Sequence, residues 1–121
     1  MGIINESTED YLETILLLSK KLPVVRAVDI VEELGYSKSS VSNALKNLRE
    51  KDYITVEIHG YIYLTQSGLA LAQSVYERHE WFTRWLINLG VDEDTAEKDA
   101  CQLEHALSEK SFKAIKKSIN L

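Results

Sequence analysis

The stretch 27–51 constrains the fold of this chain more than any other part, because apolar residues at helical spacing occur there twice, on either side of a Gly-Tyr-Ser turn. A helix is predicted over 27–34, since Gly35 follows it at the position where glycine commonly ends a helix. Ser37 can cap a second helix. The inward residues of the two helices are Ala27, Ile30, Val31, Leu34, Val41, Ala44, Leu45 and Leu48. The pattern predicts a helix-turn-helix.

The segments on either side extend this pattern. A helix is predicted over 6–21, with Ser7 as its N-cap, and Pro23 follows its end. After residue 51, the run YITVEIHGYIYLT is rich in β-branched and aromatic residues, and His59-Gly60 can turn it into a two-stranded hairpin. This order of elements predicts a winged helix-turn-helix domain over residues 1–64.

The remaining residues, 65–121, have a purely helical pattern. A long linking helix is predicted from Thr65 to Leu89, ending at Gly90. Asp92 can cap a helix that ends near Leu107, and Ser108 can cap a last one. The apolar faces, with Trp81 and Trp85, favour a helical dimerisation unit, although aromatic residues at helical spacing more often form intramolecular core. The predicted fold class is therefore mainly α.

Composition sets limits on location and partners. The chain has 121 residues, of which 45% are apolar, enough for two small compact halves. No apolar run is long enough to cross a bilayer, and the start, MGIINESTED, turns acidic at once, unlike a leader peptide. We therefore expect a cytoplasmic protein with no membrane partner. The net charge of −5 argues against coating nucleic acid by bulk attraction.

The charge is nevertheless unevenly distributed. Residues 36–51 are basic, whereas 92–97 are almost wholly acidic. Outward Lys38, Lys46 and Arg49 can neutralise DNA phosphates, while serine and asparagine side chains can bind phosphates or base edges. The DNA-binding residues predicted are Ser37, Lys38, Ser39, Ser40, Ser42, Asn43 and Lys46. A solvated helix face is the alternative, which the winged context disfavours. At the hairpin, His59 and Tyr61 could reach the DNA backbone or the minor groove, or they could be ordinary turn and sheet residues, which is the preferred interpretation of His59.

A second group of residues has the chemistry of a metal site. Cys101, Glu104 and His105 stand at positions i, i+3 and i+4 of a predicted helix, so their side chains should project from one face. A thiolate, a carboxylate and an imidazole together suit a divalent transition metal better than calcium or magnesium. The alternative is a polar face turned to water. The lone cysteine cannot form an internal disulfide.

Further candidate ligands lie elsewhere in the chain. Asp10 and Glu13 are three residues apart on the first predicted helix and can share a face. Asp10 could instead complete a capping box with Ser7, and Glu13 could be solvated. His79, in YERHEW, is by itself more often a structural histidine than a ligand. The first helix, His79 and the CQLEH segment indicate a metal site only when they are taken together.

The segments TEDYLETI, YERHEWF, LGVDED and DACQLEHALS, with the winged region, resemble the diphtheria-toxin-repressor family of metal-dependent transcriptional regulators over nearly the whole chain. The resemblance implies a homodimeric repressor that binds double-stranded operator DNA of metal-uptake genes when metal is bound. The positions that match the family's ligands are Asp10, Glu13, His79, Cys101, Glu104 and His105.

Details of the resemblance divide between branches of the family. Asp10 and Glu13 are similar to the manganese-responsive branch, whereas Cys101 is similar to the iron-responsive one. Thr83 and Glu97 stand where iron regulators usually have ancillary ligands, and the chain ends without their C-terminal β-barrel. We expect a manganese-regulator-like architecture that binds Mn²⁺ or Fe²⁺, with one metal per subunit or with two bridged by Glu104.

The expected mechanism is linkage: metal ligands from both halves would join them and set the two recognition helices of a dimer about 34 Å apart, one DNA turn. Two alternatives are a metal-independent winged-helix regulator that responds to a small molecule, and a small metallohydrolase. The sequence shows no separate general base or substrate pocket, so we expect no enzyme.

Overall fold

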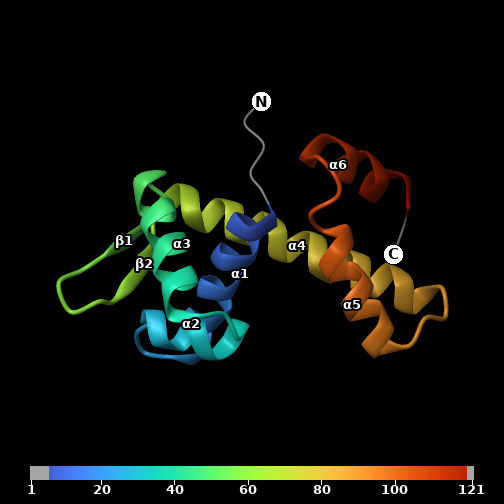
Figure 1. Cartoon of the computed structure of the whole chain (residues 1–121). Helices are drawn as coiled ribbons and strands as arrows, with labels where there is room; N and C mark the ends of the chain where they lie inside the picture. The colour runs from blue at the N-terminus through green and yellow to red at the C-terminus, as the bar shows by residue number, and fades with distance from the viewer. Residues whose placement is uncertain (1–5, 120–121) are drawn as a thin grey trace. The chain divides into compact units, whose positions relative to one another are not determined.

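The computed structural model describes residues 6–119. Within this range three helices are followed by an antiparallel hairpin and three further helices (Figure 1). The chain divides into two compact units, one that ends at Gln73 and one that begins at Ser74, and the boundary lies inside helix α4 (Gln66–Asn88). The mainly α fold with a hairpin wing and a long following helix is confirmed.

The N-terminal unit begins with α1 (Glu6–Lys21), α2 (Ala27–Leu34) and α3 (Lys38–Glu50). Gly35 ends α2 in the left-handed conformation, φ 71°, and donates its N–H to the carbonyl of Val31. The Ser37 hydroxyl caps α3 by accepting the Ser40 N–H at 3.1 Å. Both predicted helix ends are confirmed. The predicted N-cap at Ser7 is wrong, because Glu6 is already helical and Ser7 lies within the first turn.

The wing consists of β1 (Ile54–Val56) and β2 (Ile62–Leu64), which pair antiparallel with Thr55 opposite Tyr63. The predicted turn at His59-Gly60 is confirmed, and Gly60 adopts φ 86°, which suits glycine. The segment before α2 is also attached to the wing, because the Ile62 N–H donates to the carbonyl of Val25 at 2.8 Å. The start of α2 and the wing are therefore fixed relative to each other.

One apolar core holds these elements together. Side chains from all three helices and both strands are almost fully buried in it; they include Leu12, Ile15, Val25, Ile30, Val41, Leu48, Ile54 and Ile62. Burial of such side chains contributes roughly 1.5–3 kcal/mol each before conformational entropy is subtracted. Because Val41, Leu45 and Leu48 are buried on one side of α3, the opposite side of that helix faces solvent.

Helix α4 starts directly after the wing and packs against it. A Cβ at Gly68 would lie 1.9 Å from the carbonyl oxygen of Tyr53, so only glycine fits this approach. Thr65 accepts the Gly68 N–H at 3.1 Å and donates its hydroxyl to the carbonyl of Asp52 at 2.7 Å. These contacts explain why the first turns of α4 belong to the N-terminal unit.

The C-terminal unit contains the rest of α4, then α5 (Glu93–Leu103) and α6 (Glu109–Ser118), with the predicted caps Asp92 and Ser108 confirmed. Its core is formed by Trp81, Phe82, Ala100 and Phe112. The Trp81 ring meets Phe112 edge-on at 5.8 Å and is only 4% exposed. Trp81 is therefore core of its own unit, and its assignment to a dimer surface is wrong. Trp85 packs beside it, half-buried.

Among residues 6–119, none of the helices combines the length and the apolar composition that a membrane span needs.

Candidate metal centre and nucleic-acid interface

Three side chains of the C-terminal unit converge on one point: His79 of α4, Cys101 of α5 and Glu104, which caps the end of α5. His79 Nδ1 lies 2.9 Å from Glu104 Oε2 and 3.8 Å from the Cys101 sulfur. One potential ligand atom of each residue lies within 4.8 Å of the others. The structure therefore brings together a nitrogen, an oxygen and a sulfur donor that the sequence separates by up to 25 positions.

Glu104 occupies the middle of this group and is 1% exposed. Its two oxygens face different imidazoles, because Oε2 contacts His79 and Oε1 lies 3.2 Å from His105 Nε2. A buried carboxylate is costly unless it is paired, and here both imidazoles supply partners. A carboxylate with one oxygen toward each of two nitrogen ligands also has the shape needed to bind metal through either or both oxygens.

The local backbone differs from the predicted one. Helix α5 ends at Leu103 rather than near Leu107, and Glu104 is its C-cap. Residues 104–106 form a turn, in which the His105 N–H bonds to the carbonyl of Gln102. The prediction that Cys101, Glu104 and His105 project from one face of a single helix is thus wrong in its geometry. His105 reaches Glu104 from the turn, on the oxygen opposite His79.

Contacts of α4 beside the cluster include one to the segment that follows the turn. Arg78, which precedes His79, is 5% exposed, and its Nη1 donates to the carbonyl of Leu107 at 3.0 Å. The Thr83 hydroxyl donates to the carbonyl of His79 at 2.8 Å, so Thr83 serves the helix backbone. The Lys116–Glu77 ion pair at 2.6 Å adds a contact between α6 and α4. The Arg78–Leu107 hydrogen bond thus links the helix that carries His79 to the segment just after His105.

The donor set fits a divalent transition metal. Imidazole, thiolate and carboxylate together select against calcium and magnesium, which prefer oxygen ligands alone. Cys101 is exposed, so the cluster is open on the side of the thiol. An open, partly soft site of this kind suits Fe²⁺ and Mn²⁺ bound through the oxygen and nitrogen donors, with sulfur favouring the former.

Asp10 and Glu13 lie one turn apart on α1, in the N-terminal unit, and both are half-buried. The two carboxylates share a helix face, as the sequence indicates. Their participation as metal ligands stays a prediction.

The residues proposed to contact DNA all lie on the solvent side of α3. Ser37, the N-cap, is exposed, and so are the outward residues that follow it: Lys38, Ser39, Ser40, Ser42, Asn43 and Lys46. Ser37 also bonds to the Ser40 hydroxyl at 2.9 Å, which orders the first turn of the helix. The helix thus presents a polar and basic surface to solvent, while Val41, Leu45 and Leu48 on its other side are buried.

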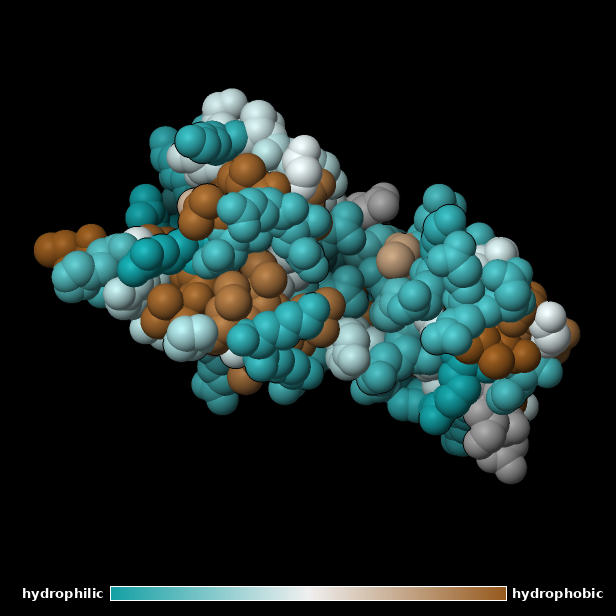
Figure 2. Space-filling model, turned by 90° about the horizontal axis from the view of Figure 1, so that it is seen from below, coloured by the Kyte–Doolittle hydropathy of each residue, from teal (hydrophilic) through white to brown (hydrophobic). Residues whose placement is uncertain are grey.

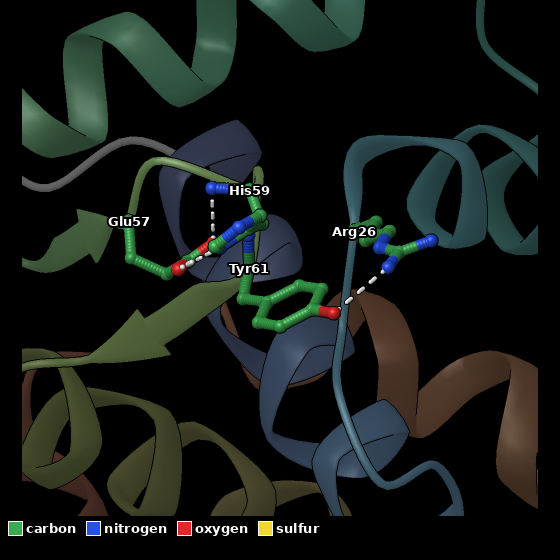
Figure 3. Close-up of polar contacts among 4 residues, drawn as sticks. All are labelled: Arg26, Glu57, His59 and Tyr61. Carbon is green, nitrogen blue, oxygen red and sulfur yellow. Dashed lines mark hydrogen bonds and ion pairs between the residues drawn. The ribbon is translucent and has the colours of Figure 1, made fainter.

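A polar network at the wing was not predicted from the sequence (Figure 3). Glu57 accepts hydrogen bonds from the backbone N–H groups of His59 and Tyr61 and contacts His59 Nδ1 at 2.9 Å. Desolvation alone would raise the pKa of Glu57, but these hydrogen bonds outweigh it, so the pKa lies below its ordinary value. Arg26 Nη2 donates to the Tyr61 hydroxyl at 3.0 Å. Thirty-five positions separate this pair, so no local pattern could have found it.

Comparison with known proteins identifies both halves. Residues 4–61 match the N-terminal DNA-binding domain of iron-dependent repressors, and residues 65–120 match the metal-binding and dimerisation domain of the same group. An uncharacterized HTH-type transcriptional regulator of Methanocaldococcus jannaschii is 34% identical over 93% of this chain and 92% of its own. The transcriptional regulator MntR of Escherichia coli O6:H1 is 34% identical over 92% of this chain and 72% of its own.

Solved structures agree with the sequence matches. A manganese-dependent transcriptional repressor in complex with manganese superimposes with a TM-score of 0.81 at 29% identity, over 92% of this chain and 51% of that one. The manganese regulator SloR gives 0.79 at 30% identity, over 91% and 52%. The chain thus spans about half the length of these solved relatives. It belongs to the iron-dependent, or diphtheria-toxin-repressor, family of transcriptional regulators, on the manganese transport regulator branch.

Proposed function

We propose that this chain represses metal-uptake genes by binding their operators as a homodimer when Mn²⁺ or Fe²⁺ occupies its C-terminal unit. The observation that carries the proposal is the convergence of His79, Cys101 and Glu104, with His105 on the second oxygen of Glu104, inside the segment that matches a metal-binding domain. The same segment matches a dimerisation domain, which supports the homodimer.

The choice of metal follows from the donors. Manganese is named for similar proteins, and the oxygen-rich part of the proposed ligand set suits it. The Cys101 sulfur adds a softer donor that favours Fe²⁺. We propose that both metals activate the chain. The sulfur of Cys101 reduces the preference of the site for Mn²⁺ over Fe²⁺.

Activation requires that metal and DNA favour the same state of the protein. A metal that binds the DNA-competent state more tightly raises DNA affinity, and DNA must then raise metal affinity by the same factor. Asp10 and Glu13 of the DNA-binding half complete the ligand set implied by the family resemblance. Their participation would give metal binding a direct effect on that half.

The partner is double-stranded DNA, which we propose is bound by the exposed residues of α3. Lys38 and Lys46 would neutralise phosphates, and the hydroxyl and amide groups of Ser37, Ser39, Ser40, Ser42 and Asn43 would bind phosphates or base edges. Because DNA is the partner, we place the protein in the cytoplasm. We propose that it acts there as a regulator and not as an enzyme. Membership in a family of metal-dependent regulators disfavours a metal-independent sensor of small molecules.

The proposal is tested by DNA-binding titrations at defined free metal concentrations. A duplex selected from a randomised library in the presence of Mn²⁺ serves as the probe, and the titrations are repeated with Fe²⁺ under anaerobic conditions and with a chelator. We expect tight binding with either metal and weak binding with the chelator. Equal binding in all three conditions would refute metal dependence.

A further inference from the structure

An arginine at the start of α2 extends its side chain to the wing. Arg26 is the N-cap residue of α2, and its backbone N–H is already satisfied by Asp29 Oδ2 at 2.8 Å. Its side chain instead extends to the wing, where Nη2 donates to Tyr61 and the guanidinium carbon lies 4.7 Å from the centre of the Tyr61 ring (Figure 3). The charge is thereby placed beside the hairpin.

This arrangement stabilises the fold only slightly. Arg26 is exposed, and cation–π contacts at exposed sites contribute little to stability. The wing is already attached to the segment before α2 by the Ile62–Val25 backbone hydrogen bond. The Arg26–Tyr61 contact is therefore not needed to attach the wing to the start of α2.

The same arrangement suits binding of an external anion. Arg26 is exposed, and within residues 6–119 its guanidinium donates to the Tyr61 hydroxyl through Nη2, so other N–H groups of its five-donor fork are available to an external acceptor. A guanidinium that is already held in place loses little conformational freedom when it binds a phosphate, and its geometry matches phosphate oxygens. The nearby carboxylate of Glu57 feels the charge of Arg26, but its hydrogen bonds come from His59 and Tyr61 of its own turn and not from the guanidinium.

The positive charge of Arg26 and the place of α2 before α3 point to a DNA phosphate as the anion. The wing sequence 53–65 contains no lysine or arginine. Arg26, at the start of α2, therefore places a positive charge beside the wing that the wing itself does not have. In a helix-turn-helix, the helix before the recognition helix crosses the DNA backbone, and α2 holds that place before α3. The hairpin tip beyond it is apolar at Ile58, which is 94% exposed, and Figure 2 shows this hydrophobic tip projecting at the left edge.

We propose that Arg26 binds a phosphate of the DNA backbone outside the base pairs contacted by α3, and that Tyr61 is the positioning residue that holds its guanidinium. The proposal rests on the proposed DNA-binding function. It makes the wing and the start of α2 a second, sequence-independent contact that adds to the recognition helix.

The test measures the salt dependence of binding to the duplex selected with Mn²⁺. Arg26→Ala should reduce the log-log salt slope by about one unit and weaken binding about tenfold at 0.1 M salt, because one phosphate contact is lost. Arg26→Lys should keep the slope. Tyr61→Phe should also keep the slope, because the charge of Arg26 stays. It should weaken DNA binding severalfold, because the hydrogen bond that positions the guanidinium is lost. Ile58→Ser and Arg84→Ala, a wing change without charge and an exposed arginine on α4, should leave the slope unchanged.

Neutral methylphosphonates placed one at a time in the duplex locate the contact. At one flanking phosphate the replacement should weaken wild-type binding but leave Arg26→Ala binding unaltered. An unchanged slope in Arg26→Ala, or no phosphate at which the two changes are coupled, would overturn the proposal. Wild-type affinity in Tyr61→Phe would remove the role of Tyr61. Absence of metal-stimulated binding by the wild type would instead refute the proposed function itself, so the two failures are distinguishable.

Discussion

The functional side chains of the two units differ in how they are held. Those on α3 are exposed and stand on a scaffold of buried residues such as Val41 and Leu48. In the C-terminal unit, Glu104 is buried and bound to His79 and His105, so function and packing involve the same atoms. A change on α3 should therefore remove one contact, whereas a change in the cluster should disturb its partners as well.

The largest effect is expected at the centre of the cluster. Glu104→Ala should abolish metal-stimulated DNA binding and lower metal affinity by more than about 100-fold, beyond the loss typical of residues that only orient ligands. His79→Ala should have the same kind of effect, somewhat smaller. Metal titrations with DNA-binding readout, together with sedimentation, measure both. Glu93→Ala, which removes an exposed carboxylate on α5 outside the proposed ligand set, is the matched control.

Each of these variants should remain a folded dimer. Metal activation like that of the wild type in either one would remove that residue from the ligand set. Loss of the dimer would show that the cluster is structural and not a switch.

A smaller change is expected at the exposed edge of the cluster. Cys101→Asp replaces a soft sulfur by a hard oxygen, so metal activation should persist while preference shifts toward Mn²⁺ and away from Fe²⁺. Activation midpoints measured for both metals, anaerobically for iron, give the ratio. The same ranking and the same midpoints in variant and wild type would mean that Cys101 does not select the metal.

On α3 the expected effect is smaller still, and each substitution should remove one contact with DNA without affecting the others. Lys46→Ala should lower the log-log salt slope of DNA binding by roughly one unit without altering metal affinity or dimerisation. Lys113→Ala, an exposed lysine on α6, serves as control. If the slope stays at its wild-type value, Lys46 makes no phosphate contact.

The smallest effect concerns a helix cap. The Thr95 N–H donates to Asp92 and holds the pKa of that carboxyl below its ordinary value of 3.8. The cap therefore contributes its full stability above pH 3.8 and loses it as the pH falls through the lowered pKa. Asp92→Asn, which keeps an acceptor, should remove this part of the acid dependence. Thermal midpoints at pH 6 and pH 3 check it, and an identical pH dependence in both proteins would exclude the contribution.

Much of the fold could be predicted because its signals are local. Gly35, Ser37, Asp92 and Ser108 mark helix ends through their own backbone and side-chain chemistry, and the structure uses each of them. The end of α5 was misplaced because the apolar spacing of Leu103 and Leu107 continues through the turn. Periodicity records which side chains face inward and not which carbonyls are bonded.

The candidate site could be predicted in composition but not in arrangement. The spacing within CQLEH indicated that its donors converge, yet the placement of His105 on the far oxygen of Glu104 depends on a turn of 104–106. The Arg26–Tyr61 pair joins segments that only the folded chain brings together. Such contacts depend on packing, which no single stretch of sequence encodes.

The account depends most on coupling between metal and DNA, and reciprocity tests it directly. Mn²⁺ affinity should be measured by calorimetric titration of the protein alone and of its complex with the selected duplex. The account predicts that DNA tightens Mn²⁺ binding by the same factor by which Mn²⁺ tightens DNA binding. Equal Mn²⁺ affinity with and without DNA would contradict it.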